Sequence, residues 1–172
     1  KGYMIQIEPN QDKYLKSEVT FKNCKFSFLE YNGQNGGGIG MFIRKPPNDK
    51  YYEKYSFIIR YNDTTFEHLY FFLDSWGGGA ISVSNEVDEN KYTAIYVNNC
   101  TFNNVSSKST SRGGGAIYYN SPRGTLEVRK SKFINTYPKN SSQYGGAIYI
   151  KYESEHMTSN IYDCEFINTR SN

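Results

Sequence analysis

Hydrophobic and polar residues alternate in short stretches, and these stretches recur at matching distances from a phenylalanine. Each marker phenylalanine follows a small residue by two positions, and the five markers are Phe26, Phe66, Phe102, Phe133 and Phe166. At five and seven residues before the markers, nine of ten positions are apolar or aromatic, with mostly polar residues between them. Because successive side chains of a strand point to opposite faces, this alternation predicts a strand with one face inward. The chain therefore predicts the same strand five times.

A bend is predicted between this strand and the marker phenylalanine. The position three residues before each marker is occupied by Asn23, Asp63, Asn99, Lys130 and Asp163. Asn and Asp tolerate left-handed backbone and hydrogen-bond to their own main chain, so they suit a turn. The small residue and the phenylalanine then form a second strand, again with both side chains on one face.

A glycine-rich motif alternates with the phenylalanine signature and predicts a third strand. Gly-Gly-Gly-Ala-Ile occurs at 77–81 and 113–117, Gly-Gly-Ala-Ile at 145–148, and a degenerate copy at 36–39. Glycine is expected where the chain turns with positive φ or where the sheet has no room for a Cβ. The residues that vary in number lie after this motif, at 44–55, 84–92, 120–124 and 151–159. We expect these loops to project from one side and to carry function.

These repeats predict an all-β chain folded as a parallel β-helix, a solenoid of about five three-stranded coils. The markers are 40, 36, 31 and 33 residues apart, and no helical periodicity separates the strands. Residues 1–18 are assigned to the end of a preceding coil or an N-terminal strand, and residues 19–172 to the repeats. Equivalent side chains should stack, with the phenylalanines in one column and asparagines hydrogen-bonded in another. The chain begins and ends within the pattern, so we expect a fragment of a longer protein.

The alternating motifs resemble those of a known family. Gly-Gly-Ala-Ile combined with a Phe/Asn signature, at Asn104, Asn135 and Asn168, resembles the repeats of polymorphic outer membrane proteins (Pmp). Such repeats occur in chlamydial autotransporter passenger domains and in Pmp-like surface proteins of trichomonads. In that family Asn follows Phe by three residues, whereas here it follows by two, and Phe28 and His68 fill this position in the first two repeats. The resemblance implies a right-handed β-helix with an adhesive or structural role at the cell surface or outside the cell, and no catalysis.

Composition and charge narrow the choice of partners. The chain has 37% hydrophobic and 17% aromatic residues, and the aromatic content argues against disorder. The net charge is +3, with 20 basic residues scattered along the chain, so nucleic acid is not an expected partner. No stretch of 18 apolar residues is present, so this segment is not expected to span a membrane.

The three cysteines occupy the small position of the repeat, two positions before a marker phenylalanine. They are Cys24, Cys100 and Cys164, with Thr64 and Ser131 in the repeats between them. Two cysteines are then two coils apart, roughly 9.6 Å, which is beyond disulfide reach. We expect three free, buried thiols that act as small hydrophobic side chains, and no metal or redox site.

Other candidate sites are few. Among the glycosylation sequons only Asn140 lies between motifs, and we take it as the candidate glycan acceptor. The acidic loop with Glu86, Asp88 and Glu89 lacks the spacing of a calcium site, so no metal or cofactor is expected. Asp63 and Asp163 share a repeat position but are separated by other residues, which does not favour a paired-carboxylate enzyme.

Aromatic side chains expected on the outer wall or in loops are the candidate ligand contacts. They are Tyr51, Tyr52, Tyr55, Trp76, Tyr118 and Tyr149. Tyr and Trp often anchor recognition surfaces and stack on sugars, although they also cover strands without any binding role. The favoured hypothesis is a non-enzymatic adhesion or display segment that binds a host-cell or matrix protein or a glycan. The alternatives are a polysaccharide lyase or glycosidase with its site elsewhere, and a filament built by self-association through open ends.

Overall fold

The chain forms parallel strands arranged in three sheets. The structure is a computed structural model and describes residues 5–7, 16–33, 39–43, 55–73, 77–85, 91–109, 113–138, 145–151 and 154–171. Within these ranges the regular elements are strands, and no helix is found. Every strand pairing in the sheets is parallel, which confirms the prediction of an all-β chain with parallel strands.

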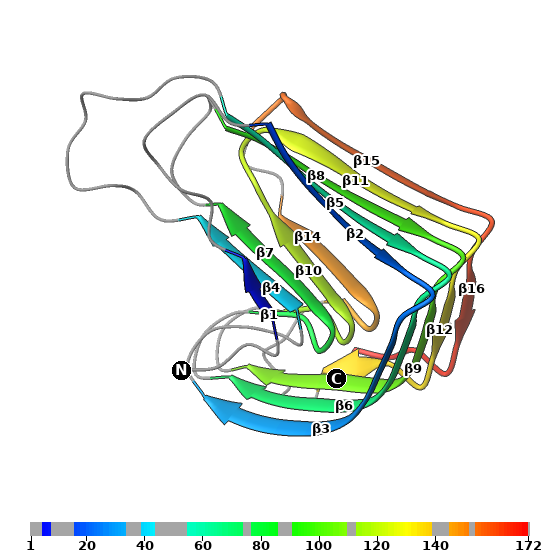
Figure 1. Cartoon of the computed structure of the whole chain (residues 1–172). Coiled ribbons are helices and arrows are strands. Elements are labelled where there is room, and N and C mark those ends of the chain that lie inside the picture. The colour runs from blue at the N-terminus through cyan, green and yellow to red at the C-terminus, as the bar shows by residue number, and fades with distance from the viewer. Residues whose placement is uncertain are drawn as a thin grey trace.

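When β13 is left aside, each sheet collects every third strand of the chain (Figure 1). Sheet A contains β1 (Ile5–Ile7), β4 (Ile39–Ile43), β7 (Ile81–Asn85), β10 (Ile117–Asn120) and β14 (Ile148–Lys151). Sheet B contains β2 (Lys16–Lys22), β5 (Tyr55–Asn62), β8 (Lys91–Asn98), β11 (Gly124–Arg129) and β15 (Met157–Tyr162). Sheet C contains β3 (Lys25–Gly33), β6 (Thr65–Leu73), β9 (Thr101–Ser109), β12 (Lys132–Ile134) and β16 (Glu165–Ile167), and β13 (Tyr137–Pro138) also pairs with β9.

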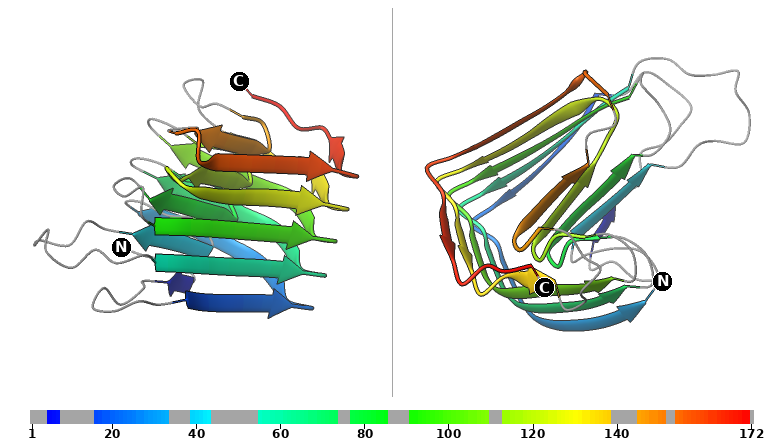
Figure 2. Two further views of the ribbon diagram at one scale, coloured as in Figure 1. Left: turned by 90° about the horizontal axis from the view of Figure 1, so that it is seen from above. Right: turned by 180° about the vertical axis from the view of Figure 1, so that it is seen from behind.

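We call the successive sets of three strands repeats 1 to 5, from β1–β3 to β14–β16. Figure 2 shows the repeats lying one above another, with the strands of each sheet in matching positions. Sheets B and C meet at a sharp bend, and sheet A lies across from sheet B (Figures 1 and 2). The hydroxyl of buried Tyr119, on β10, donates to the carbonyl of Thr93 on β8 at 2.7 Å and so links sheets A and B.

A column of stacked phenylalanines fills the interior beside the bend. Neighbouring rings along Phe26, Phe66, Phe102, Phe133 and Phe166 have centroids 4.6 to 5.2 Å apart and interplanar angles of 1 to 16°. The three central rings are fully buried. Each such pair contributes about 0.5–1.5 kcal/mol beyond the burial of its area. The predicted aromatic column is confirmed.

An isoleucine column and the predicted asparagine column are also present. Ile39, Ile81, Ile117 and Ile148 are register partners in sheet A. The side-chain nitrogen of Asn135 donates to Asn104 at 3.1 Å, and that of Asn168 donates to Asn135 at 3.2 Å. The asparagine ladder expected in repeats 3 to 5 is therefore formed.

Two columns of left-handed residues shape each repeat. The first is the predicted bend, where the five residues three positions before the phenylalanines have φ between 49° and 54°. The second was not predicted and lies two positions after the phenylalanines, at Phe28, His68, Asn104, Asn135 and Asn168, with φ between 51° and 55°. Asn adopts this backbone readily, which explains its recurrence in repeats 3 to 5.

The small residue of each repeat is a hydrogen-bond donor. Its thiol or hydroxyl donates to the carbonyl two residues earlier, at 2.8 to 3.5 Å, in Cys24, Thr64, Cys100, Ser131 and Cys164. Cys, Ser and Thr therefore alternate because each is small and carries a donor. The expectation that the cysteines act as hydrophobic side chains missed this bond.

The three thiols are free, as predicted, but only one is fully buried. Cys100 lies in the middle of the stack and is 1% exposed, whereas Cys24 and Cys164 lie in repeats 1 and 5 and are half-buried. Among the described strands of sheet C, β3 and β16 each pair with a single neighbour, and the expectation of three buried thiols was wrong for Cys24 and Cys164.

Burial of the neutral thiol makes a pH-dependent contribution to stability. Burial raises the pKa of the Cys100 thiol to about 11, whereas an unfolded cysteine titrates near about 8.5. The unfolded state therefore releases this proton first, and the contribution is complete below about pH 8.5 and is lost as the pH rises toward about 11.

Replacement of Cys100 by Ser, the residue of repeat 4, should remove this pH dependence. Between about pH 8 and pH 10 the free energy of unfolding should fall by about 2 kcal/mol more in the native chain than in Cys100→Ser, from the pKa difference. Urea denaturation at several pH values measures both. A parallel decline in the two proteins would contradict the prediction.

The glycine runs lie where backbones of neighbouring repeats approach closely. A Cβ at Gly115 would lie 2.1 Å from the carbonyl oxygen of Gly146 and 2.6 Å from the nitrogen of Tyr137. At Gly79 it would lie 2.5 Å from the carbonyl oxygen of Gly115. Lack of room for a Cβ, one of the two predicted reasons, therefore applies at both positions.

Gly115→Ala should destabilise the protein strongly, because the clash is with backbone atoms that cannot rotate away. We expect a loss of about 3 kcal/mol, at the upper end for overpacking. Asn160→Ala, on the exposed side of β15, serves as the control and should change stability by less than about 0.5 kcal/mol. Chemical denaturation measures the free energy of unfolding of both variants. Equally small effects would show that the backbones packed around Gly115 can move apart, and would contradict the prediction.

Candidate functional site

Two stacked rings form an exposed platform on sheet C. Phe28 on β3 exposes 75% of its surface, the largest value among the exposed large hydrophobic side chains described. Its ring lies on the imidazole of His68 on β6, with centroids 4.8 Å apart and planes at 13°. We call this pair the Phe28–His68 platform.

The backbone beneath the platform is strained. Phe28 has φ of 55° and His68 has φ of 53°. A bulky residue rarely adopts the left-handed region, which costs roughly 1–2 kcal/mol for residues other than Gly, Asn and Asp. Repeats 3 to 5 avoid this strain with asparagine. Strained residues that persist at an exposed position are candidates for function.

Polar groups flank the platform on the same two strands. The Lys25 ammonium of β3 lies 2.7 Å from a Glu67 carboxylate oxygen on β6, and Lys25 remains largely exposed. Asn104, the next residue in the column, continues the edge of the platform toward repeat 3. A flat aromatic surface beside charged and amide groups can receive the apolar face of a ring and hydrogen-bond to its substituents.

The outer face of sheet B carries a second network of polar and aromatic side chains. The guanidinium of Arg60 lies 4.4 Å from the centre of the Tyr96 ring and also pairs with Glu18 at 2.5 Å. Burial, followed by the neighbouring Tyr92, raises the pKa of the Tyr96 hydroxyl. Between β15 and β11 of the same sheet, the Tyr162 hydroxyl donates a hydrogen bond to a Glu127 carboxylate oxygen at 3.2 Å. On this face of sheet B, the charged groups and hydroxyls named above contact one another.

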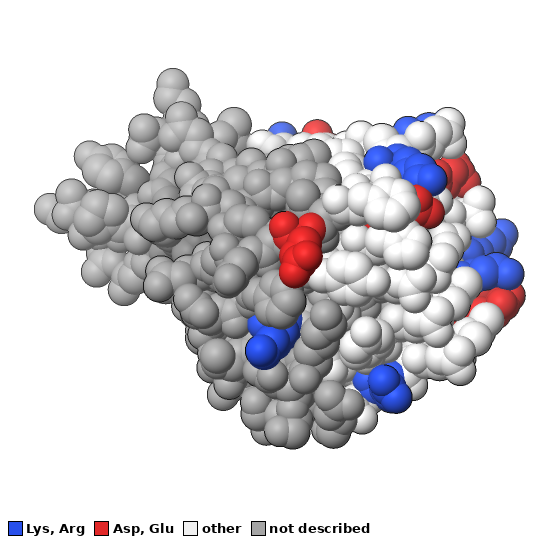
Figure 3. Space-filling view, turned by 90° about the horizontal axis from the view of Figure 1, so that it is seen from below, with Lys and Arg blue, Asp and Glu red and all other residues white. Residues whose placement is uncertain are grey.

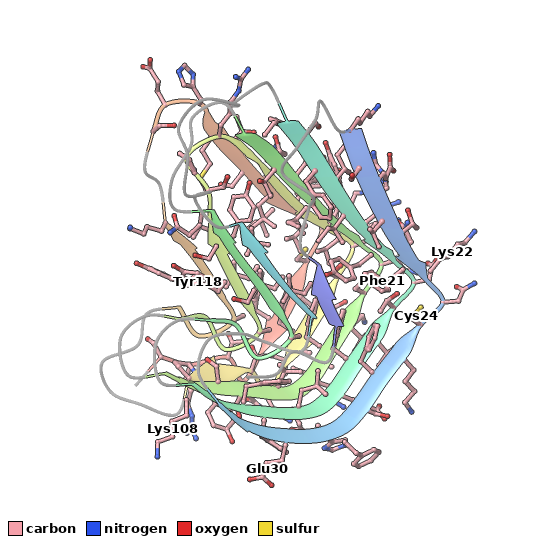
Figure 4. All side chains as sticks on the ribbon, turned by 60° about the vertical axis from the view of Figure 1, so that its left-hand side comes forward. Phe21, Lys22, Cys24, Glu30, Lys108 and Tyr118 are labelled. Atoms are coloured by element: carbon pink, nitrogen blue, oxygen red, sulfur yellow. The ribbon has the colours of Figure 1, made fainter. Side chains whose placement is uncertain are left out.

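Only two aromatic residues predicted as ligand contacts have side chains that the structure describes. Tyr118 was expected to be exposed but is fully buried, and Tyr149 is half-buried. Tyr118 lies on the side of sheet A that faces away from sheet B (Figure 4), where its ring stacks on that of Tyr149 with centroids 5.8 Å apart and planes at 24°. Tyr51, Tyr52, Trp76, Asn140 and the acidic loop at 86–89 lie outside the described residues, and so does the side chain of Tyr55 at the start of β5.

The remaining candidate groups are dispersed. Asp63 and Asp163 occupy the same left-handed position in repeats 2 and 5, with Asn99 and Lys130 between them. Over the residues that the structure describes, no cluster of three His, Cys, Asp or Glu side chains could hold a metal ion. The same residues include no helix long and apolar enough to cross a membrane.

Charges of both signs are mixed on the surface seen from below. Figure 3 shows small patches of Lys and Arg and of Asp and Glu scattered over the described part of this face, with uncharged surface between the patches. The ion pair of Lys132 with Glu165, at 3.0 Å, is one example in sheet C.

Comparison of the chain with protein-family models, with curated proteins and with solved structures finds no match.

Sequence reasoning did not select Phe28 and His68 as a site, although the signal was present. Both interrupt a column that is asparagine in the other repeats. That the column is left-handed, and that the two rings would stack outside the sheet, emerges only from the backbone conformation and register.

Replacing both platform residues by asparagine should stabilise the protein. Phe28→Asn combined with His68→Asn relieves two strained positions and extends the asparagine ladder, at the loss of one ring stack. We expect a gain of about 1–2 kcal/mol in the free energy of unfolding, from the left-handed penalty. Asn135→Ala, which breaks the ladder in the same column, should lower stability, and urea denaturation measures both. A loss of stability in the double variant would contradict the strain argument.

Proposed function

We propose that the three sheets are the walls of a right-handed parallel β-helix, and that this chain is a non-enzymatic binding segment of a cell-surface or secreted protein. The repeated passage from sheet A to B to C supports the β-helix, as do the in-register columns of Phe, Asn and small donors. The proposed role is that of Pmp-like surface proteins, which the alternating motifs resemble.

The observation that carries the binding role is the Phe28–His68 platform. It combines 75% exposure of a phenylalanine with backbone strain that asparagine would relieve. Exposed aromatic surface supported by strained backbone favours neither solubility nor stability, so a binding role accounts for it best.

The chemistry of the platform favours a glycan as ligand. The face of a pyranose ring presents C–H groups that pack on an aromatic ring, while its hydroxyls hydrogen-bond to neighbouring polar groups. Lys25 and Glu67, which lie on the same two strands and pair with each other, offer a donor and an acceptor to the hydroxyls of such a ring. A protein ligand would instead place an apolar side chain on the platform, and the experiment below distinguishes the two.

Binding to a glycan array by the 172-residue chain tests this proposal. The native chain should bind a defined set of glycans without degrading them. Phe28→Asn/His68→Asn should lose at least about five-fold in affinity, because stacking on an aromatic ring contributes about 1–3 kcal/mol. Asn135→Ala is the control, because it alters the same column away from the platform and should bind as the native chain does.

Three outcomes would count against the proposal. Turnover of any polysaccharide would favour the enzyme alternative. Equal binding by the platform variant would place the site elsewhere on the surface. Binding to immobilised host-cell or matrix proteins with no glycan signal would replace the glycan by a protein ligand.

A further inference from the structure

The bend between sheets B and C presents one exposed side chain in every repeat. The left-handed bend residues are exposed in all five repeats, at Asn23, Asp63, Asn99, Lys130 and Asp163. Figures 1 and 2 show this bend as an outer corner of each repeat, on the side away from sheet A. Figure 4 shows Lys22 and Cys24, on either side of the bend residue of repeat 1, at this corner. A side chain at the bend position therefore reaches solvent in the middle of the stack as it does elsewhere.

In repeat 3 the bend residue begins a glycosylation sequon. Asn99-Cys100-Thr101 matches the Asn-x-Ser/Thr pattern of an acceptor for an N-linked glycan. The other bend asparagine, Asn23, is followed at the third position by Lys25 and has no such pattern. An N-linked glycan is bulky and polar and needs a surface position, which is what the corner gives Asn99. Spacing along the sequence did not favour Asn99, because it lies inside the repeated motifs.

We infer that Asn99 carries an N-linked glycan. The donor would be an oligosaccharide attached to a lipid diphosphate in the membrane of the secretory pathway. The Nδ2 atom bonds to the anomeric carbon of the first sugar as the bond from that carbon to the diphosphate oxygen breaks. The lipid diphosphate leaves with that electron pair, and the amide loses one proton. Because this transfer takes place in the secretory pathway, the inference rests on the secreted or cell-surface location in the proposed function.

The folded bend accommodates a modified amide at this position. The Nδ2 atom of Asn99 donates to a carboxylate oxygen of Asp63, the bend residue of the preceding repeat, at 2.7 Å. A primary amide carries two N–H donors, and glycosylation replaces one of them. The remaining N–H can keep the bond to Asp63, so the glycan would not cost this contact between repeats. The backbone of Asn99, with φ of 52°, is unaffected by the modification.

The sequon of repeat 2 is placed differently. Asn62-Asp63-Thr64 begins one residue before the bend, so that its asparagine lies on sheet B rather than at the corner. Asn62 is half-buried, and its amide oxygen accepts a hydrogen bond from Asn98 at 3.5 Å. The Thr64 hydroxyl is itself buried and donates to the carbonyl of Asn62 at 2.9 Å. A shift of one residue along the chain therefore removes the exposure that Asn99 has.

The sequon that begins at Asn104 lies in the asparagine column. Asn104 is half-buried, and its amide oxygen accepts a hydrogen bond from Asn135 at 3.1 Å. It follows Phe28 and His68 in this column, so a glycan on Asn104 would stand beside the Phe28–His68 platform. Among the sequons in the part of the chain that the structure describes, Asn99 is the one at an exposed corner.

Expression of the 172-residue chain behind a cleavable signal peptide in cultured eukaryotic cells tests the inference. A glycosidase that removes N-linked glycans in heavy-oxygen water converts each glycan-bearing asparagine to a labelled aspartate, which peptide mass spectrometry locates. The native chain should show the label at Asn99. Chain retained in the cells is examined together with secreted chain, so that poor secretion does not obscure the result.

Two substitutions at Thr101 form a matched pair. Thr101→Val removes the sequon hydroxyl and keeps the branched side chain, and it should lose the label at Asn99 completely. Thr101→Ser keeps a sequon and should retain the label. Thr101 is half-buried on β9, and its backbone bond to Thr64 is unchanged by either substitution, so both variants should fold.

Two results would overturn the inference. One is a native chain with no label at Asn99, including a chain whose glycans are confined to Asn62, Asn104 or Asn140. The other is a label at Asn99 that persists in Thr101→Val, because it would then not come from a glycan on the sequon.

Failure of this inference is distinguishable from failure of the glycan-binding role. Thr101→Val should lose the glycan at Asn99 and bind the glycan array as the native chain does. Phe28→Asn/His68→Asn should lose array binding and keep the glycan at Asn99. An unmodified native chain that still binds the array would overturn the modification alone, and a modified chain that binds no glycan would overturn the binding role alone.

Discussion

The structure depends on one constraint, the in-register repetition of the bend between sheets B and C. In every repeat a left-handed residue turns the chain, a small donor bonds to a carbonyl two residues back, and a phenylalanine enters the interior. Hydrogen bonds between repeats hold each bend in register with the next. For example, the backbone amide of Cys100 donates to the hydroxyl of Ser131 at 3.1 Å. A register shift by one residue would break all three features together. This explains why loops elsewhere vary in length while this corner does not.

Much of the fold follows from the sequence because most positions of a column carry chemically similar residues. The alternation before Phe102, the Asn at 99 and the Gly run at 113–115 each predict a local conformation, and repetition removes the ambiguity of a single motif. Other features need three-dimensional information. Tyr118 alternates with inward residues and yet is buried, because what covers an outer face cannot be read from strand periodicity. The half-burial of Cys24 depends on how many neighbours its repeat has, which a single-repeat pattern does not encode.

The proposed binding site departs from the pattern of its own column. In repeats 3 to 5 this position is asparagine, which adopts the left-handed backbone readily and forms the hydrogen-bonded ladder. Phe28 and His68 give up both advantages and gain an exposed flat surface held by the same backbone. The stack holds the two rings face to face, so that the proposed ligand would meet a preorganised surface. Such preorganisation lowers the entropy lost on binding.

The parallel stacking of repeats also determines how the protein would respond to tension. Backbone hydrogen bonds between repeats lie along the stacking direction, for example from Thr101 to the carbonyl of Thr64 at 3.0 Å. A force pulling the two ends of the stack apart would therefore load one interface at a time, and repeats would detach in sequence. With 31 to 40 residues between successive marker phenylalanines, each detachment releases roughly 100–140 Å of extended chain. A chain built this way would lengthen in steps under load, which would limit the peak force along it.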